Sequence, residues 1–115
     1  MQFNFAIVTA ALVAAAAPAT ATVTFKAHAG ADCTGTVLAT SNGDPLNTCV
    51  YFANGGSAKS ISYSGIPKGD KGEFYKSGGE TDKCKGSPAV VTGSGSGCAT
   101  APAGFNLESF KYVKA

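Results

Sequence analysis

The four cysteines, Cys33, Cys49, Cys84 and Cys98, are the residues of this sequence with the clearest chemistry. An even number of cysteines favours disulfide bonds when a small protein reaches an oxidising compartment. A structural zinc site is the competing interpretation, but it needs closely spaced cysteine pairs or several histidines. No two cysteines here have that spacing, and His28 is the only histidine. The sequence therefore predicts two disulfides and no metal cofactor.

Candidate catalytic residues form no recognisable motif. His28 has no partner motif near it, and its place near a strand end predicts an exposed side chain. Most of the carboxylates lie beside turns or lysines, as solubilising charges do, although two of them could converge as a glycosidase pair. A domain this small has little room for a deep cleft, so we expect no enzymatic activity and no cofactor. The carboxylates are Asp32, Asp44, Asp70, Glu73, Glu80, Asp82 and Glu108.

The N-terminus carries a segment that would direct the chain out of the cell. Residues 6–17 read AIVTAALVAAAA, a run without charge that matches the apolar region of a signal peptide and is too short to cross a bilayer. Ala19 and Ala21 then provide the small residues that a signal peptidase accepts. A buried N-terminal helix is the alternative, but it would carry polar residues on one face. We predict a signal peptide over residues 1–21, a secreted extracellular protein and, because no second apolar run follows, no integral membrane domain.

The charge pattern argues against nucleic acid as a partner. Nine lysines, seven acidic residues and no arginine give a net charge of +2. Five of the lysines lie between Lys68 and Lys85, where four acidic residues interleave with them. A mixed stretch of this kind is typical of a solvated surface, and the chain lacks the arginine that usually reads phosphates and bases.

The sequence after residue 21 contains an internal repeat. Cys33 and Cys84 each begin the pattern C-x-G-[ST], and Cys49 and Cys98 are each followed eleven residues later by S-Φ-x-Y, where Φ is apolar. Matching positions are 49 to 51 residues apart, which indicates a duplicated unit. We predict a single domain over residues 22–115 made of two repeats, residues 22–66 and 67–115. The matched residues are Cys33 and Cys84, Gly35 and Gly86, Cys49 and Cys98, and Ser60 and Ser109.

Each repeat reads as a set of short strands. Runs rich in threonine, valine and aromatic residues, such as VTF, CVYFA, GEFY and SFKYV, are separated by glycine, asparagine and proline, which is typical of strands and turns. About eight strands would form a sandwich of two antiparallel sheets. The predicted fold class is therefore all-β.

On these residues the chain resembles the βγ-crystallin family, whose domains contain two Greek-key motifs. The resemblance implies that Gly35 and Gly86 allow each hairpin to fold over with a positive φ, and that Ser60 and Ser109 hydrogen-bond back to those hairpins. Tyr75 matches the first-strand aromatic residue of the second motif. Cysteines replace the aromatic residue that the family usually carries two positions before the hairpin glycine. The chain is also similar to small secreted cysteine-containing proteins of filamentous fungi, and it resembles secreted killer toxins and antifungal proteins of this fold.

Symmetry of the repeats does not decide the pairing of the cysteines, because all three connectivities respect a duplication. We favour Cys33–Cys49 and Cys84–Cys98, since closing a short loop costs the least chain entropy. A Greek key that exchanges a strand between its sheets would favour Cys33–Cys98 with Cys49–Cys84 instead.

Calcium is the ligand that the resemblance raises first, because many βγ-crystallin domains bind it through [ND]-[ND]-x-x-[ST]-S. In the first repeat the corresponding stretch, residues 56–61, has Lys59 and no acidic residue. In the second it offers only Asn106 and Ser109, whereas calcium takes six to eight oxygen ligands. These two residues are weak candidates, and we expect no tight metal site.

The resemblance implies a binding protein as the function. We expect a monomeric, non-enzymatic, disulfide-stabilised protein with a toxin-like, antimicrobial or host-directed effector role. Its target would be extracellular: a cell-wall glycan, a membrane or a secreted protein. One alternative is that the protein inhibits a secreted protease through its own loop Ile66-Pro67-Lys68. Another is that it is a structural or calcium-responsive extracellular protein. A cluster of exposed aromatic residues would mark the contact face.

Overall fold

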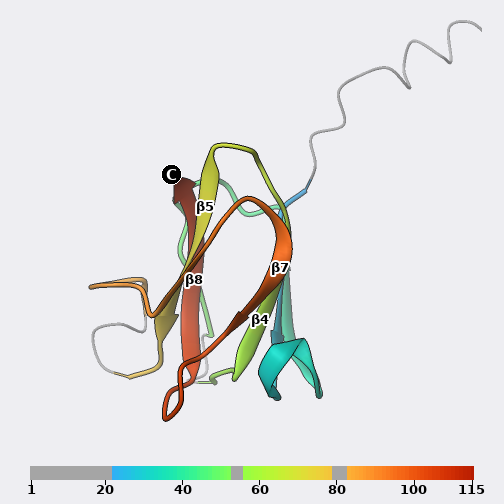
Figure 1. Ribbon diagram of the computed structural model, residues 1–115, viewed down its shortest axis with the longest axis vertical. Helices are drawn as coiled ribbons and strands as arrows, with labels where there is room; N and C mark the ends of the chain where they lie inside the picture. Colours follow the sequence, from blue (N-terminus) through green and yellow to red (C-terminus); the bar gives the residue numbers. More distant parts are fainter. Residues whose placement is uncertain (1–21, 53–55, 79–82) are drawn as a thin grey trace, which may run out of the picture.

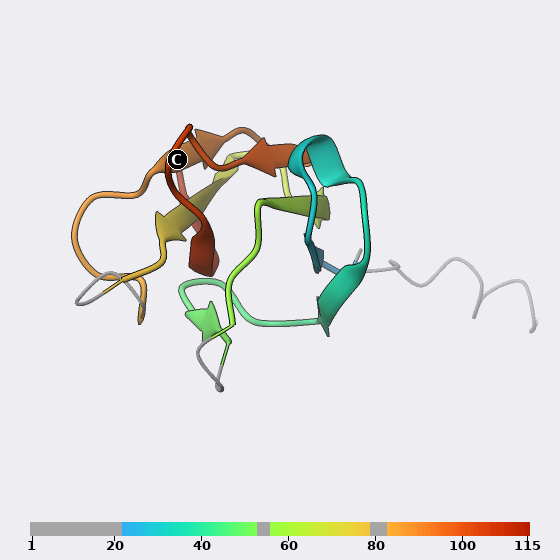
Figure 2. The same ribbon diagram turned by 90° about the horizontal axis from the view of Figure 1, so that it is seen from below.

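A computed structural model describes residues 22–52, 56–78 and 83–115, and in these segments the chain is built from strands with almost no helix. The strands form two antiparallel sheets of four strands each that face one another (Figures 1 and 2). The predicted all-β architecture of two antiparallel sheets is confirmed. The predicted signal peptide, residues 1–21, lies outside the described residues.

The two sheets have the same arrangement of strands. The first has the order β2-β1-β4-β7, with β1 at Thr24–His28, β2 at Val37–Asn42, β4 at Ser60–Ile66 and β7 at Gly95–Thr100. The second has the order β3-β8-β5-β6, with β3 at Val50–Tyr51, β5 at Asp70–Lys76, β6 at Val90–Thr92 and β8 at Leu107–Lys114. A single 3₁₀ turn, η1 at Ala31–Cys33, follows β1.

Each sheet takes one strand from the other half of the chain. β3 precedes β4 in the sequence but pairs with β8, and β7 precedes β8 but pairs with β4. The sheets also touch where the two halves meet, because Ala58 and Leu107 exchange backbone hydrogen bonds of 2.8 and 2.7 Å. Neither half can therefore complete its sheet without the other.

Aromatic rings from both sheets fill the space between them. Phe25 of β1, Phe74 of β5 and Phe110 of β8 are at most 4% exposed. The ring centroids of Phe25 and Phe110 are 4.6 Å apart, and those of Phe25 and Phe74 are 6.0 Å apart in an edge-to-face arrangement, which aromatic pairs prefer. Because side chains alternate along a strand, the neighbours of these residues point outward and form the two outer faces.

The favoured cysteine pairing is wrong. The disulfides join Cys33 to Cys98 and Cys49 to Cys84, with Cα atoms 6.0 and 5.9 Å apart. The strand exchange is the reason. β7 carries Cys98 into the first sheet, next to the η1 turn that contains Cys33. β3 places Cys49 in the second sheet, on which the hairpin that contains Cys84 is held by Ser109. The cost of closing a loop in the unfolded chain does not decide which sulfurs meet in the folded protein.

The repeated serines hold the two hairpins on the outer faces of the sheets. Ser60 accepts a hydrogen bond of 2.8 Å from the N–H of Cys33, and Ser109 accepts one of 2.9 Å from the N–H of Cys84. Both serines are completely buried. The glycine two residues after each of these cysteines has a positive φ, +79° at Gly35 and +77° at Gly86. These four residues thus form the same local structure twice.

We predict that peptide mapping of the oxidised protein will find the pairs Cys33–Cys98 and Cys49–Cys84. These bridges are separated by 65 and 35 residues in the sequence, so in the chain-entropy model each should stabilise the fold by about 4 kcal/mol. Replacing either pair by serines should lower the free energy of unfolding by that order, as measured by urea denaturation. Recovery of the local pairs Cys33–Cys49 and Cys84–Cys98 would contradict this topology.

Candidate functional site

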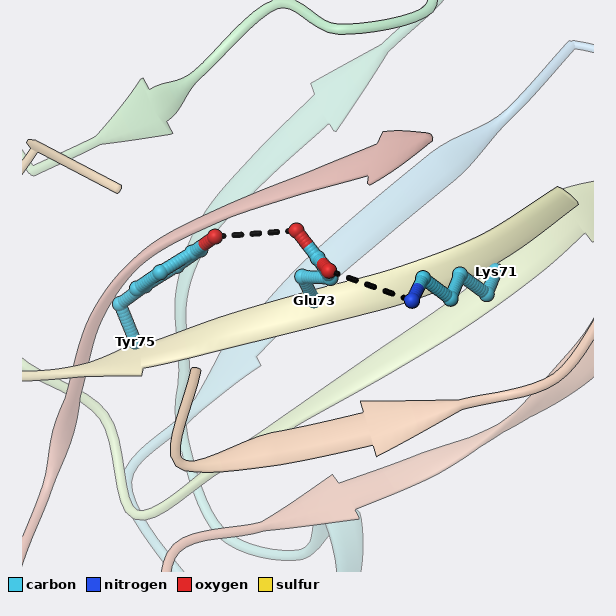
Figure 3. Close-up of polar contacts among 3 residues, drawn as sticks. All are labelled: Lys71, Glu73 and Tyr75. Atoms are coloured by element: carbon cyan, nitrogen blue, oxygen red, sulfur yellow. Dashed lines mark hydrogen bonds and ion pairs between the residues drawn. The ribbon is translucent and has the colours of Figure 1, made fainter. Parts of the chain in front are cut away.

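Three polar side chains lie in a row on the outer face of β5. Lys71, Glu73 and Tyr75 are alternate residues of this strand, so they share the side opposite to buried Phe74. Figure 3 shows Glu73 between the other two: the Tyr75 hydroxyl donates a hydrogen bond of 2.9 Å to Oε1 of Glu73, and Nζ of Lys71 lies 3.6 Å from Oε2. The carboxylate is therefore held from both sides.

The neighbouring strands extend this row into a face. Lys111 of β8 is directly opposite Glu73, and its Nζ lies 5.9 Å from the centre of the Tyr75 ring. Tyr51 of β3 shares a register position with Ser109, as Tyr75 does on the other side. Tyr51 is 45% exposed. We call this surface the tyrosine face; it comprises Tyr51, Lys71, Glu73, Tyr75 and Lys111.

Tyr75 is only 3% exposed although it points away from the core. The hairpin of Cys84 lies on this face, since Cys84 donates to Ser109, the residue directly opposite Tyr75. Burial, with the adjacent Glu73 carboxylate, raises the pKa of Tyr75 from 10.0 to about 12. The phenol therefore stays protonated at neutral pH and serves as a hydrogen-bond donor. A group with this pKa is poorly suited to general acid–base catalysis near neutrality.

A second aromatic contact extends the tyrosine face at its edge. The Nζ atom of Lys83 lies 5.3 Å from the centre of the Tyr51 ring. A similar contact occurs at Phe105, which is 43% exposed and has the Nζ of Lys76 4.8 Å from its ring centre. Lysines over exposed rings supply both positive charge and a flat apolar surface, a combination that suits recognition of a polar or anionic partner.

His28 is buried, and the expectation that it would be exposed is wrong. It is 8% exposed at the end of β1, and its Nε2 lies 3.0 Å from the hydroxyl oxygen of Ser62 on β4. A serine–histidine contact could be half of a nucleophile and base pair, but the base then needs a third group to orient it. Within the described residues Nδ1 of His28 has no hydrogen-bond partner. Among the described residues, the serine–histidine pair therefore has no orienting group.

The side chains of the two calcium candidates, Asn106 and Ser109, form hydrogen bonds within this chain. The amide of Asn106 donates a hydrogen bond of 3.2 Å to Ser57, and Ser109 is engaged by the Cys84 hairpin. Close by, the ammonium group of Lys59 donates to the carbonyl oxygens of Pro102 and Phe105 at 3.3 and 3.2 Å. A positive charge beside carbonyl oxygens opposes the binding of a second cation. Among the described residues no group of three or more His, Cys, Asp or Glu side chains could hold a metal ion.

The described carboxylates each have a contact of their own. Asp32 accepts a hydrogen bond from Thr100, Asp44 from Ser41 and Glu108 from Ser77, while Asp70 pairs with Lys114 at 3.3 Å. All of these contacts except the one between Asp44 and Ser41 join segments that are far apart in the sequence. Glu80 and Asp82 lie outside the described residues.

The row on β5 was missed in the sequence although a signal for it exists. Lys71, Glu73 and Tyr75 alternate within a single strand-like run, and that period predicts a shared face. Only the contacts with Lys111 and Tyr51 depend on the sheet order. Lys59 departs from the calcium motif already in the sequence. Its hydrogen bonds to the carbonyl groups of Pro102 and Phe105, in another loop, can be seen only in the structure.

Comparisons of this chain with protein families, with curated proteins and with solved structures found no match. In the segments that the structure describes, no helix has the length and apolar character needed to cross a membrane.

We predict that Tyr75 ionises near pH 12 and that this ionisation affects stability at high pH. Because folding raises its pKa from 10.0 to about 12, its contribution to stability is fully present below pH 10 and is lost as the pH rises toward 12. The Tyr75→Phe variant should lack the step near pH 12 in an absorbance titration, and its stability should fall less steeply over this range.

The Tyr51→Phe variant is the matched control for this titration. It removes a phenol from the same face but should keep the step near pH 12. An unchanged titration curve for Tyr75→Phe would show that the step belongs to another group.

Proposed function

We propose that this chain is a secreted, βγ-crystallin-like double Greek-key protein that acts outside the cell on another organism. The strand order supports the fold part of this proposal. In a Greek key the fourth strand returns by a long connection to lie beside the first, and here β4 lies beside β1 and β8 beside β5. The paired fold-over hairpins at Gly35 and Gly86, each held by a buried serine, support the family resemblance.

The cysteines and the predicted signal peptide support secretion. All four cysteines are in disulfides, which persist in oxidising compartments and are rare where glutathione keeps thiols reduced. Residues 1–21 carry the features of a cleavable signal peptide. The two observations are independent, since one concerns the leader and the other the folded domain.

The role that the geometry supports best is a toxin-like, antimicrobial or host-directed effector that works by binding. The disulfide connectivity carries this proposal, because each bridge joins the two halves of the chain and fastens an exchanged strand. These disulfides keep the surface of the domain rigid under harsh extracellular conditions. The accessible part of the tyrosine face, the exposed Tyr51 ring with Lys83 beside it, would supply the contact surface. Its target would be a cell-wall glycan, a membrane surface or a secreted protein.

A growth-inhibition and host-response assay tests this role. Protein expressed from the full sequence and purified oxidised should act on a competitor microbe or a host tissue, whereas reduced and alkylated protein should not. Tyr51→Ala should weaken the effect about tenfold if Tyr51 is a binding hot spot. The control is Leu38→Ala, because Leu38 is 47% exposed on the other sheet while Tyr51 is 45% exposed. Absence of any effect at high concentration, or equal activity of the alkylated protein, would contradict the proposal.

A protease inhibitor is the second candidate, and the turn between β4 and β5 favours it. The N–H of Asp70 donates a hydrogen bond of 3.0 Å to the carbonyl of Pro67, and Ile66 anchors the turn with 3% exposure. Lys68 is exposed at its tip. An exposed lysine on a rigid turn could enter the pocket of a serine protease that cleaves after lysine.

Inhibition of secreted, lysine-specific serine proteases tests this second candidate. The wild-type protein should inhibit at least one such enzyme, and Lys68→Ala should abolish the inhibition. Lys26→Ala is the control, since Lys26 is also exposed but lies on β1. Equal inhibition by the two variants would exclude the turn as the contact.

A structural, calcium-responsive role has weaker support than either of these. The stretch in the first repeat contains Lys59, whose ammonium group already contacts two carbonyl oxygens. The stretch in the second repeat contains Asn106 and Ser109, and Ser109 is completely buried.

A further inference from the structure

An apolar slot of about 240 Å³ lies between the edge strands β2 and β3. Core rings from both sheets, Phe25 and Phe110, line it, together with Val50 and Phe52 from the β3 segment. Ala39 of β2 forms the opposite wall. The slot thus reaches from the edge of the sandwich to the aromatic core.

A difference between the two halves explains why the slot exists. Phe25 and Phe74 are matched core residues, and each faces one residue of its edge strand. Val90 faces Phe74 and packs against the core, whereas Ser41 faces Phe25. The hydroxyl of Ser41 donates to the carboxylate of Asp44. The smaller, polar side chain therefore leaves space where the other half of the domain has a valine.

The described residues leave the mouth of the slot open to solvent. Thr40 and Tyr51 both line it, and both are exposed on the outer side of the edge strands. A ligand could therefore enter without moving the core. Its polar group would meet a hydroxyl at the mouth, and its apolar part would replace solvent against Phe25 and Phe110.

We infer that this slot binds a small free aromatic molecule of one or two rings with a polar substituent. The walls include four aromatic side chains, Phe25, Tyr51, Phe52 and Phe110, and aromatic rings favour edge-to-face and offset contacts with one another. Its volume also fits, since an apolar cavity of about 150 Å³ holds benzene and this slot has about 240 Å³. The slot shares Tyr51 with the tyrosine face, but its other lining residues are different, and the inference does not depend on the proposed function.

Titration of the oxidised protein with 2-naphthol tests the inference. Binding should be saturable with a Kd below about 1 mM, and the NMR signals of Phe25, Val50 and Phe110 should shift. Filling the slot by Ala39→Leu, or by Ser41→Val to copy Val90, should weaken binding at least about tenfold. Thermal melting checks that both variants fold, and filling the space should leave the Tm equal or higher.

Thr92→Val is the matched control. Thr92 lies on β6, the edge strand of the second sheet opposite to β3, and it faces Gly72 of β5. This variant should bind 2-naphthol like the wild type. Failure to saturate at about 1 mM, or unchanged binding by the folded Ala39→Leu and Ser41→Val variants, would overturn the inference. A tryptophan-containing extended peptide that bound tenfold more tightly than 2-naphthol would overturn the assignment to a free molecule, because the slot would then accept a side chain of a protein partner.

Discussion

Strands β3 and β7 each pair with the sheet built by the other half of the chain, and the remaining features follow from that exchange. It brings Cys98 next to the η1 hairpin and Cys49 next to the hairpin of Cys84. It also joins the halves at Ala58 and Leu107, where the backbone groups bond reciprocally. A bridge between distant residues restricts the unfolded chain more than a local one. The exchange therefore makes two disulfides brace the whole domain.

The repeat can be predicted from the sequence, whereas the pairing of the cysteines cannot. Matched spacing identified Ser60 and Ser109, because each serves the hairpin of its own repeat and the chemistry stays local. The cysteine pairs depend on which strand crosses to which sheet, and no residue type encodes that choice. Chain entropy describes the unfolded state, so it favoured Cys33–Cys49, whereas the folded geometry brings Cys33 to Cys98.

The tyrosine face can be predicted from the sequence only in part. Alternation along β5 predicts that Lys71, Glu73 and Tyr75 share a side, which local sequence can reveal. Burial of Tyr75 requires the Cys84 hairpin to lie over it, and this depends on the hydrogen bond to Ser109 of another strand. The raised pKa of Tyr75 is thus a property of the assembled sheet. The residue type alone would place its pKa near 10.0.

The short strand β3 contributes residues to both the slot and the tyrosine face. Val50 lines the slot, and Tyr51 both lines its mouth and belongs to the tyrosine face. Cys49, just before them, carries the bridge to Cys84. β3 has only these two strand residues, so its ladder hydrogen bonds give it little independent stability. The Cys49–Cys84 bridge must therefore position both surfaces at once. Reduction of this bridge would loosen the wall of the slot and the exposed ring of the tyrosine face together, whereas the Cys33–Cys98 bridge lies on the other sheet.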